Sequence, residues 1–326
     1  MRKGKTLKIR AIPSRSDYKV LVTGGSGLVG AAVVRYLRSL DMQVIAPSHR
    51  ELNLMNGEAT RDFFDNCRPQ IVVACAARVG GIAANIANPV DFLVENLAIQ
   101  NSTFLAAADA EVSQFVFMAS SCIFPRNAPQ PMSESQLMTG LLEPTNESYA
   151  IAKLAGIQLA KALKQEGRLS TNVLVPCNVY GPEDNFNLEK AHVTSALVRK
   201  FVDAVDERDK FVSVWGTGTA RRELMHSHDL ASAVAHVLNN EDVPFIANVG
   251  TGVDHSIKQL AELVAELSGF DGEIVFDDRF PDGMPQKVLD TSVLANSGWR
   301  AQVGLKTGVA ELIKTYRSLI TAQLNN

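Results

Sequence analysis

A glycine-rich loop near the start of the chain constrains the fold more than any other feature. It reads Gly24-Gly25-Ser26-Gly27-Leu28-Val29-Gly30 and lies between an apolar run at 20–22 and a periodic stretch at 29–40. A strand, a glycine turn and a helix in this order bring bare backbone close to a pyrophosphate. The N-terminus of such a helix offers unpaired N–H groups and a partial positive charge. The loop therefore predicts a dinucleotide site, and all seven of its residues are assigned to cofactor binding.

The chain after the loop alternates strand-like and helix-like stretches, as a parallel sheet with helices on both faces requires. This pattern predicts an α/β fold, a Rossmann-type doubly wound parallel sheet with a smaller, discontinuous C-terminal substrate domain. Long helices with one apolar face are predicted at 92–109 and 149–164. The strands are predicted at 19–23, 43–46, 70–74, 114–119 and 172–175.

The predicted domain organisation follows from where this alternation stops. Residues 18–180 form the predicted nucleotide-binding domain, and 181–326 form mainly the substrate domain, where the pattern loosens into loops and shorter elements. A strand-like stretch at 245–252 is expected to return to the first domain. Residues 1–17 carry six basic side chains with no acid before Asp17, and we interpret them as a loose basic extension.

Composition agrees with a water-soluble enzyme. The 326 residues are 46% hydrophobic and 21% charged, which suffices for a large core. A net charge of -3 gives no electrostatic reason to expect nucleic acid or an anionic membrane as partner, and no apolar stretch reaches the length of a membrane span. Because the four cysteines show no metal or redox spacing and no secretory signal precedes them, we expect reduced thiols in a cytoplasm.

The stretch Pro47-Ser48-His49-Arg50-Glu51 follows the second predicted strand, where this kind of fold selects its nicotinamide cofactor. A cation at Arg50, helped by Ser48 and His49, suits the 2′-phosphate of NADPH, because charge-assisted contacts to phosphate are strong. Glu51 is the residue that argues for NAD, since an acid can bind the ribose 2′-hydroxyl. Arg50 could also be a solvated surface charge. The sequence favours NADPH.

Tyr149 and Lys153 are predicted to lie on one face of a helix, four residues apart. A phenol with a pKa near 10 transfers protons poorly at neutral pH, and a nearby ammonium is expected to lower that pKa. Ser120, at the end of a predicted strand, can donate a hydrogen bond to the same carbonyl oxygen. Together with the glycine loop, this pair indicates a reductase.

With these features the chain resembles the extended short-chain dehydrogenase/reductases, and within them the GDP-L-fucose synthases, which are 3,5-epimerase-4-reductases. The resemblance covers nearly the whole chain after residue 18. The stretches that carry it are Arg78-Val79-Gly80-Gly81-Ile82, Ser120-Ser121-Cys122-Ile123-Phe124-Pro125, Glu143-Pro144-Thr145-Asn146-Glu147-Ser148-Tyr149, Asn178-Val179-Tyr180-Gly181-Pro182-Glu183-Asp184-Asn185-Phe186, His192-Val193, Val214-Trp215-Gly216-Thr217-Gly218 and Asn248-Val249-Gly250-Thr251-Gly252.

The resemblance implies that GDP-4-keto-6-deoxy-D-mannose is converted to GDP-L-fucose with NADPH. A ketone at C4 acidifies the hydrogens at C3 and C5, so inversion needs one group to remove a proton and another to return it. Cys122 and His192 are similar to that acid–base pair, since thiols and imidazoles titrate on either side of neutral pH. Ser120 and Tyr149 would stabilise the enolate oxygen, and Tyr149 would protonate it during reduction.

The resemblance also implies a homodimer, built through the predicted helices at 92–109 and 149–164, and further binding residues. Lys200 stands where arginine is frequent, so a bidentate phosphate contact is lost there. Thr194-Ser195 departs from the usual apolar-proline pair after the histidine. Further cofactor contacts are implied for Ser121, Lys153, Pro176, Asn178 and Val179, and substrate contacts for Lys200, Trp215, Arg222 and Asp282.

Several alternatives stay open. Related enzymes that make GDP-colitose or GDP-6-deoxyheptoses use the same framework, so the sequence does not select the hexose. A sugar-nucleotide 4-epimerase or dehydratase would bind NAD tightly and would not need both Cys122 and His192. A nucleotide-binding scaffold would need none of the proton-transfer residues. The run His226-Ser227-His228-Asp229 resembles a metal site, but histidines two residues apart point in different directions, so no metal is expected.

Overall fold

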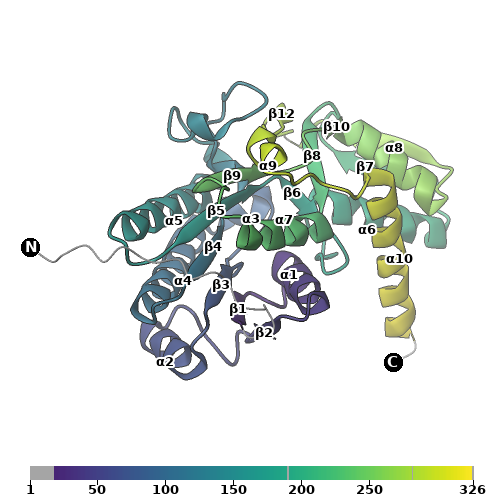
Figure 1. Cartoon of the computed structure of the whole chain (residues 1–326). Helices are drawn as coiled ribbons and strands as arrows, with labels where there is room; N and C mark the ends of the chain where they lie inside the picture. Colours follow the sequence, from purple (N-terminus) through teal and green to yellow (C-terminus); the bar gives the residue numbers. More distant parts are fainter. Residues whose placement is uncertain (1–17, 189–190, 281, 325–326) are drawn as a thin grey trace, which may run out of the picture.

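A computed structural model describes residues 18–188, 191–280 and 282–324 of the chain. The basic extension predicted at 1–17 lies outside the described residues. The described part forms two neighbouring bodies, with the central sheet in one and helices α6, α8 and α10 in the other (Figure 1).

The first body is built on a six-stranded sheet in the order β2-β1-β3-β4-β5-β9, and every neighbouring pair is parallel. The five predicted strands and the returning strand are confirmed. The chain passes from β1 to β2 and then crosses back to β3 on the other side of β1, so the strand order reverses between β1 and β3. Ligands of such folds bind at this switch point. The strands are β1 (Lys19–Thr23), β2 (Gln43–Ile45), β3 (Ile71–Ala74), β4 (Gln114–Met118), β5 (Thr171–Pro176) and β9 (Ile246–Val249).

Helices cover both faces of this sheet, α1 and α7 on one and α2, α4 and α5 on the other (Figure 1). The two predicted long helices are confirmed, although each begins a few residues earlier than expected. Val20, Leu21 and Val22 of β1 are fully buried, because a sheet covered on both faces has no solvent side. The helices are α1 (Leu28–Ser39), α2 (Gly57–Cys67), α4 (Pro89–Asp109), α5 (Glu147–Gln165) and α7 (Ser227–Asn239).

The second body has a hydrophobic cluster of its own, around Phe201, Leu260 and Leu312. Its small sheets pair β8 (Arg221–His226) with its three neighbours, and β7 with β11. The remaining strands are β6 (Asn178–Tyr180), β7 (Phe211–Trp215), β10 (Asp254–Ser256), β11 (Glu273–Asp277) and β12 (Gln286–Lys287), and the helices are α6 (Val193–Glu207), α8 (Ile257–Ser268) and α10 (Leu305–Leu324).

The expectation of loops and shorter elements beyond residue 181 is wrong. Helices α6, α7, α8 and α10 contain 15, 13, 12 and 20 residues. In α6 the apolar Leu197, Val198, Phe201 and Val202 are buried at helical spacing, so the period was present in the sequence. Both α7 and β9 pack in the first hydrophobic cluster. The domain boundary near residue 180 therefore stays a prediction.

Short elements complete the described chain. They include the helices α3 (Ile82–Ala87) and α9 (Ser292–Asn296), and 3-10 turns at Ser121–Ile123, Glu134–Gln136 and Pro144–Asn146. Among the residues described, no helix combines the length and the apolar character needed to cross a membrane.

Candidate active site

A cavity of about 670 Å³ opens at the carboxyl ends of β1, β3, β4 and β5 and extends to the second body. Its position agrees with the rule that open α/β sheets bind ligands beyond the carboxyl ends of their strands. Most of the predicted site residues line it. These are Gly24, Ser26, Gly27, Leu28, Val29, Gly30, His49, Ser120, Cys122, Tyr149, Pro176, Asn178, Val179, His192 and Arg222.

The glycine loop forms the nucleotide end of the cavity, and two of its glycines are required by geometry. Gly24 has φ +68°, and a Cβ there would lie 2.8 Å from the backbone of Ala76 on the neighbouring strand end. A Cβ on Gly30 would lie 2.0 Å from the carbonyl oxygen of Gly24. The loop thus closes tightly on itself and leads into α1 with Gly27 at the helix N-cap. The free N–H groups of that terminus suit a pyrophosphate.

The charged and titratable side chains of residues 47–51, after β2, differ in their contacts and in whether they line the cavity. The Glu51 carboxylate accepts hydrogen bonds from the Ser48 amide (2.7 Å) and hydroxyl (2.8 Å), which lower its pKa. Both bonds end on Oε2 and hold Glu51 in its own turn. His49 lines the cavity, whereas Arg50 is exposed and lies outside the lining. The segment fits a cofactor with a 2′-phosphate, with His49 nearer to it than Arg50.

Tyr149 and Lys153 lie in the first turns of α5, and the Lys153 ammonium is 5.8 Å from the centre of the Tyr149 ring. Lys153 is buried and its Nζ donates to the Met118 carbonyl at the end of β4 (2.8 Å). Burial lowers the pKa of Lys153 to about 8. Burial raises the pKa of Tyr149, the nearby Cys122 raises it further, and a hydrogen bond with Ser120 opposes both.

The prediction that Lys153 lowers the pKa of Tyr149 is therefore wrong for this arrangement, since burial has the larger effect. Desolvation disfavours the phenolate and the ammonium alike. The consequence is a tyrosine that holds its proton and a lysine that can lose its own near pH 8. Such a tyrosine is suited to donating its proton to an oxygen that becomes anionic, rather than to removing one.

Cys122 is buried at the turn that follows β4, within reach of the same tyrosine. Its thiol lies 3.1 Å from the Ser120 hydroxyl, which also accepts from the Cys122 amide at 3.5 Å. Ser120 therefore contacts both the thiol and Tyr149. The Ser120 hydroxyl, the Cys122 thiol and the Tyr149 hydroxyl thus lie together at the end of β4, where each can donate a hydrogen bond to a substrate carbonyl or accept one near it. Ser121, in the same turn, is buried outside the cavity lining.

His192 comes from the second body and occupies the N-cap position of α6. Its exposed side chain lines the cavity that Cys122 also lines. The structure thus brings into one cavity a thiol and an imidazole that are 70 residues apart in sequence. A thiol and an imidazole, two groups that can carry protons, thus line the same cavity.

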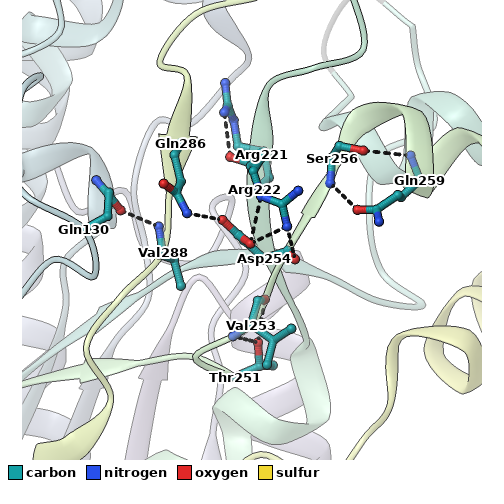
Figure 2. A network of polar contacts seen from close by, with 10 residues as sticks. All are labelled: Gln130, Arg221, Arg222, Thr251, Val253, Asp254, Ser256, Gln259, Gln286 and Val288. Carbon is teal, nitrogen blue, oxygen red and sulfur yellow. Dashed lines mark hydrogen bonds and ion pairs between the residues drawn. The ribbon is translucent and has the colours of Figure 1, made fainter.

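Arg222 of β8 is the one predicted substrate residue that lines the cavity. Its guanidinium donates to the carbonyls of Met284 (2.6 Å) and Asp282 (2.9 Å), which joins β8 to the 282–287 segment. Its neighbour Arg221 pairs with Asp254 at 2.7 Å, and Gln286 donates to the same carboxylate at 2.6 Å (Figure 2). These contacts hold β8, β10 and β12 together. They fix the strand from which Arg222 reaches the cavity.

The other predicted substrate residues, Lys200, Trp215 and Asp282, lie outside the cavity lining. The Lys200 ammonium donates to the Ser213 carbonyl (2.8 Å) and lies 5.6 Å from the centre of the Trp215 ring. Trp215 is exposed and stacks on Phe280 with ring centres 4.3 Å apart. Asp282 accepts from the Thr217 amide and hydroxyl. Trp215 is thus exposed, whereas the charged Lys200 and Asp282 are half-buried.

Sequence reasoning missed four charged residues that line the cavity: Arg78, Glu95, Glu143 and Lys287. Burial lowers the pKa of Lys287, and a negative charge on Cys122 opposes that shift. Arg78 and Glu143 stand within motifs that carried the resemblance, so a signal for them existed. Lys287 had none, because it enters the site only through the pairing of β12 with β8. Within the described ranges, no group of three or more His, Cys, Asp or Glu side chains is arranged to hold a metal.

Comparison with known proteins identifies the family of this fold and site. The model of the NAD dependent epimerase/dehydratase family matches residues 20–250. The chain belongs to this family. Its sequence is 44% identical to a probable GDP-L-fucose synthase 1 of Oryza sativa subsp. japonica, over 91% of this chain and 92% of that protein. The predicted resemblance to the GDP-L-fucose synthases is confirmed.

Solved structures agree with this assignment. A GDP-6-OMe-4-keto-L-xylo-heptose reductase of C. jejuni superposes with a TM-score of 0.88 at 30% identity, covering 93% of this chain and 99% of that one. A GDP-L-fucose synthetase of Naegleria fowleri bound to NADP gives a TM-score of 0.84 at 25% identity, covering 94% and 95%. The predicted Rossmann-type fold is confirmed.

Proposed function

We propose that this protein is an NADPH-dependent epimerase-reductase that converts GDP-4-keto-6-deoxy-D-mannose to GDP-L-fucose. The observation that carries the proposal is the meeting of Cys122, His192, Ser120 and Tyr149 in one cavity. A reductase alone needs the last two, whereas inversion at carbon also needs two proton carriers. The relatives named for GDP-L-fucose synthesis and for NADP binding support this choice.

In the proposed reaction Ser120 and Tyr149 hold the C4 oxygen of the sugar. Cys122 and His192 remove and return protons at C3 and C5, while Ser120 and Tyr149 stabilise the enolate oxygen that forms. Bound NADPH supplies the hydride for C4. Tyr149, whose pKa burial raises, then donates its proton to the C4 oxygen. Lys153 can replace that proton, since its pKa is lowered to about 8. The same two contacts to the C4 oxygen therefore serve both epimerisation and reduction.

The glycine loop, His49 and the residues after β5 are proposed to hold NADPH, and Arg222 the charged part of the sugar nucleotide. The loop fits this role because a Cβ at Gly24 or Gly30 would collide with neighbouring backbone, so only glycine lets the loop close tightly beside a pyrophosphate. Arg222 and Lys287 supply positive charge at the opposite end of the cavity, which suits a diphosphate. Lys200, Trp215 and Asp282 lie outside the cavity lining, so we propose that they contact the substrate from the surface next to the cavity.

The proposal includes a homodimer and a cytoplasmic location. Val90 and Val94 of α4 and Ile151 of α5 are large apolar side chains exposed on helices that pack together. A second copy of these helices would cover them. Sedimentation at micromolar concentration should give a dimer, and a monomer would contradict this part. All four cysteines are free, as is usual in a reducing cytoplasm.

The deciding experiment offers GDP-, UDP- and dTDP-linked 4-keto-6-deoxy sugars to the enzyme in D2O and follows NADPH oxidation. Only the GDP-linked sugar should be reduced efficiently, with one NADPH used per product and deuterium at both C3 and C5. Reduction with no deuterium at either carbon would instead favour a GDP-sugar 4-reductase, the activity that the C. jejuni structure is named for. No turnover of any sugar nucleotide would contradict the proposal.

A further inference from the structure

The segment 184–186, which follows β6, is attached to the first turn of α6 by a buried pair. Ser195 is fully buried, and its hydroxyl donates to Oδ2 of Asp184, which is 9% exposed. The other oxygen of Asp184 accepts from the Asn185 amide at 2.8 Å. A buried carboxylate needs such donors, because it has left water. The pair therefore fixes the segment against the helix.

His192 depends on the same turn for its position. It is the N-cap of α6, three residues before Ser195, and its carbonyl accepts from the Ala196 amide at 2.9 Å. The imidazole does not cap the helix, so its placement in the cavity follows from where the backbone of this turn lies. Ser195 and Asp184 determine that backbone position from the buried side.

The same hydrogen bond bears on the charge of Asp184. Burial raises the pKa of this carboxyl, whereas the hydrogen bond from Ser195 lowers it. The Ser195 hydroxyl therefore favours the ionised carboxylate at a buried position, and a charge-assisted bond of this kind is stronger than a neutral one.

We propose that Asp184 and Ser195 are positioning residues for His192: their hydrogen bond fixes the first turn of α6, from whose N-cap position His192 lines the cavity. The inference rests on the proposed function, in which His192 carries a proton. A second contact holds the same segment, because Arg199 donates to the Phe186 carbonyl at 3.1 Å. Loss of the Ser195 bond should thus leave the segment attached and the protein folded.

Two substitutions test the hydrogen bond from its two sides. Ser195→Ala removes the donor, whereas Asp184→Asn leaves Ser195 a neutral and therefore weaker acceptor. Each should slow deuterium exchange into GDP-4-keto-6-deoxymannose in D2O by roughly tenfold, as small misplacements of catalytic groups do. The Kd for NADPH, followed by its fluorescence, should stay as in the native protein. Because the two residues act as one unit, the double variant should lose less than the product of the two effects.

Glu183→Gln is the matched control, since this carboxylate is next to Asp184 but pairs with Arg35 of α1 instead. It should exchange like the native enzyme. If the native enzyme exchanges neither proton, the proposed function has failed before the variants are compared. If the native enzyme exchanges and both variants match it, the positioning role is wrong. If exchange and NADPH binding fall together in both variants, the pair merely stabilises the fold, which also overturns the inference.

Discussion

The two ends of the cavity are built in different ways. The nucleotide end is mostly backbone: the glycine loop and the N-terminus of α1 come from one continuous strand–turn–helix unit. The sugar end consists of side chains from separate elements, with Cys122 after β4, His192 before α6, and Arg222 and Lys287 from a second sheet. A short motif describes the first end, whereas only the complete fold assembles the second.

This difference predicts how each end responds to substitution. Backbone N–H groups survive any change of side chain that the loop can accommodate, so affinity at the nucleotide end should resist most single substitutions. At the sugar end each side chain has its own task, and its loss should be felt at one step of the reaction. The predictions below test this contrast.

The largest effect is expected for Cys122→Ser. A serine hydroxyl is far less acidic than a thiol, so deuterium exchange into the 4-keto sugar should fall by about 100-fold or more. NADPH binding should not change, because the thiol lies at the sugar end. NMR of the sugar in D2O without NADPH measures the exchange directly.

Cys75→Ser is the matched control for that experiment, since Cys75 lines the same cavity at the end of β3. Burial raises the pKa of its thiol to about 12, so it is a poor proton carrier at neutral pH. Its replacement should leave exchange near the native rate. Native exchange at both carbons in Cys122→Ser would show that the Cys122 thiol is only structural.

Lys153 gives the next largest effect, as a pH dependence. Its pKa is lowered to about 8, so the ammonium is present below that pH and is lost as pH rises through it. Since the ammonium supplies the positive charge and replacement proton beside Tyr149, kcat/KM for reduction should fall above about pH 8, approaching tenfold per pH unit. Lys153→Arg, which stays charged, should remove this limb. A native rate that is flat between pH 8 and 10 would contradict the role.

Much of the molecule was predictable from sequence, for reasons that the two ends make clear. The six strands of the main sheet are apolar runs buried on both faces, and the glycine loop is a local motif, so both were found. Tyr149 and Lys153 share one helix. The long helices beyond residue 181 are present in the sequence as 3.6-residue periods of apolar residues, so the prediction of loops there was wrong although the signal existed.

Other features could not follow from local pattern. Lys287 reaches the cavity only because β12 pairs with β8, more than 60 residues away in sequence. The direction of the Tyr149 pKa depends on burial, which spacing along a helix does not reveal. The hydrogen bonds that hold Glu51 to Ser48 are another such contact. The sequence predicts the type of each element better than it predicts the burial and the contacts of individual side chains.

Lys287→Met should raise the KM for the sugar nucleotide by about tenfold, because one charge-assisted contact with an anionic substrate is lost. The Kd for NADPH should stay constant, which tests the separation of the two ends. Lys258→Met is a suitable control, since Lys258 is exposed on α8 and lies 3.9 Å from Glu262. A drop in kcat with an unchanged KM would instead place Lys287 in the chemistry, next to Cys122.

The smallest effect is expected at the nucleotide end. His49→Ala should lower the ratio of kcat/KM for NADPH over NADH by two- to fivefold, the size of an exposed charge pair of about 0.2–1 kcal/mol. Arg50→Ala should lower it less, since Arg50 is exposed and outside the cavity lining. Initial rates with both cofactors measure the ratio. Because the pyrophosphate is held by backbone, both variants should still bind NADPH. If either substitution abolished that binding, side chains would dominate this end as well, and the contrast between the two ends would be wrong.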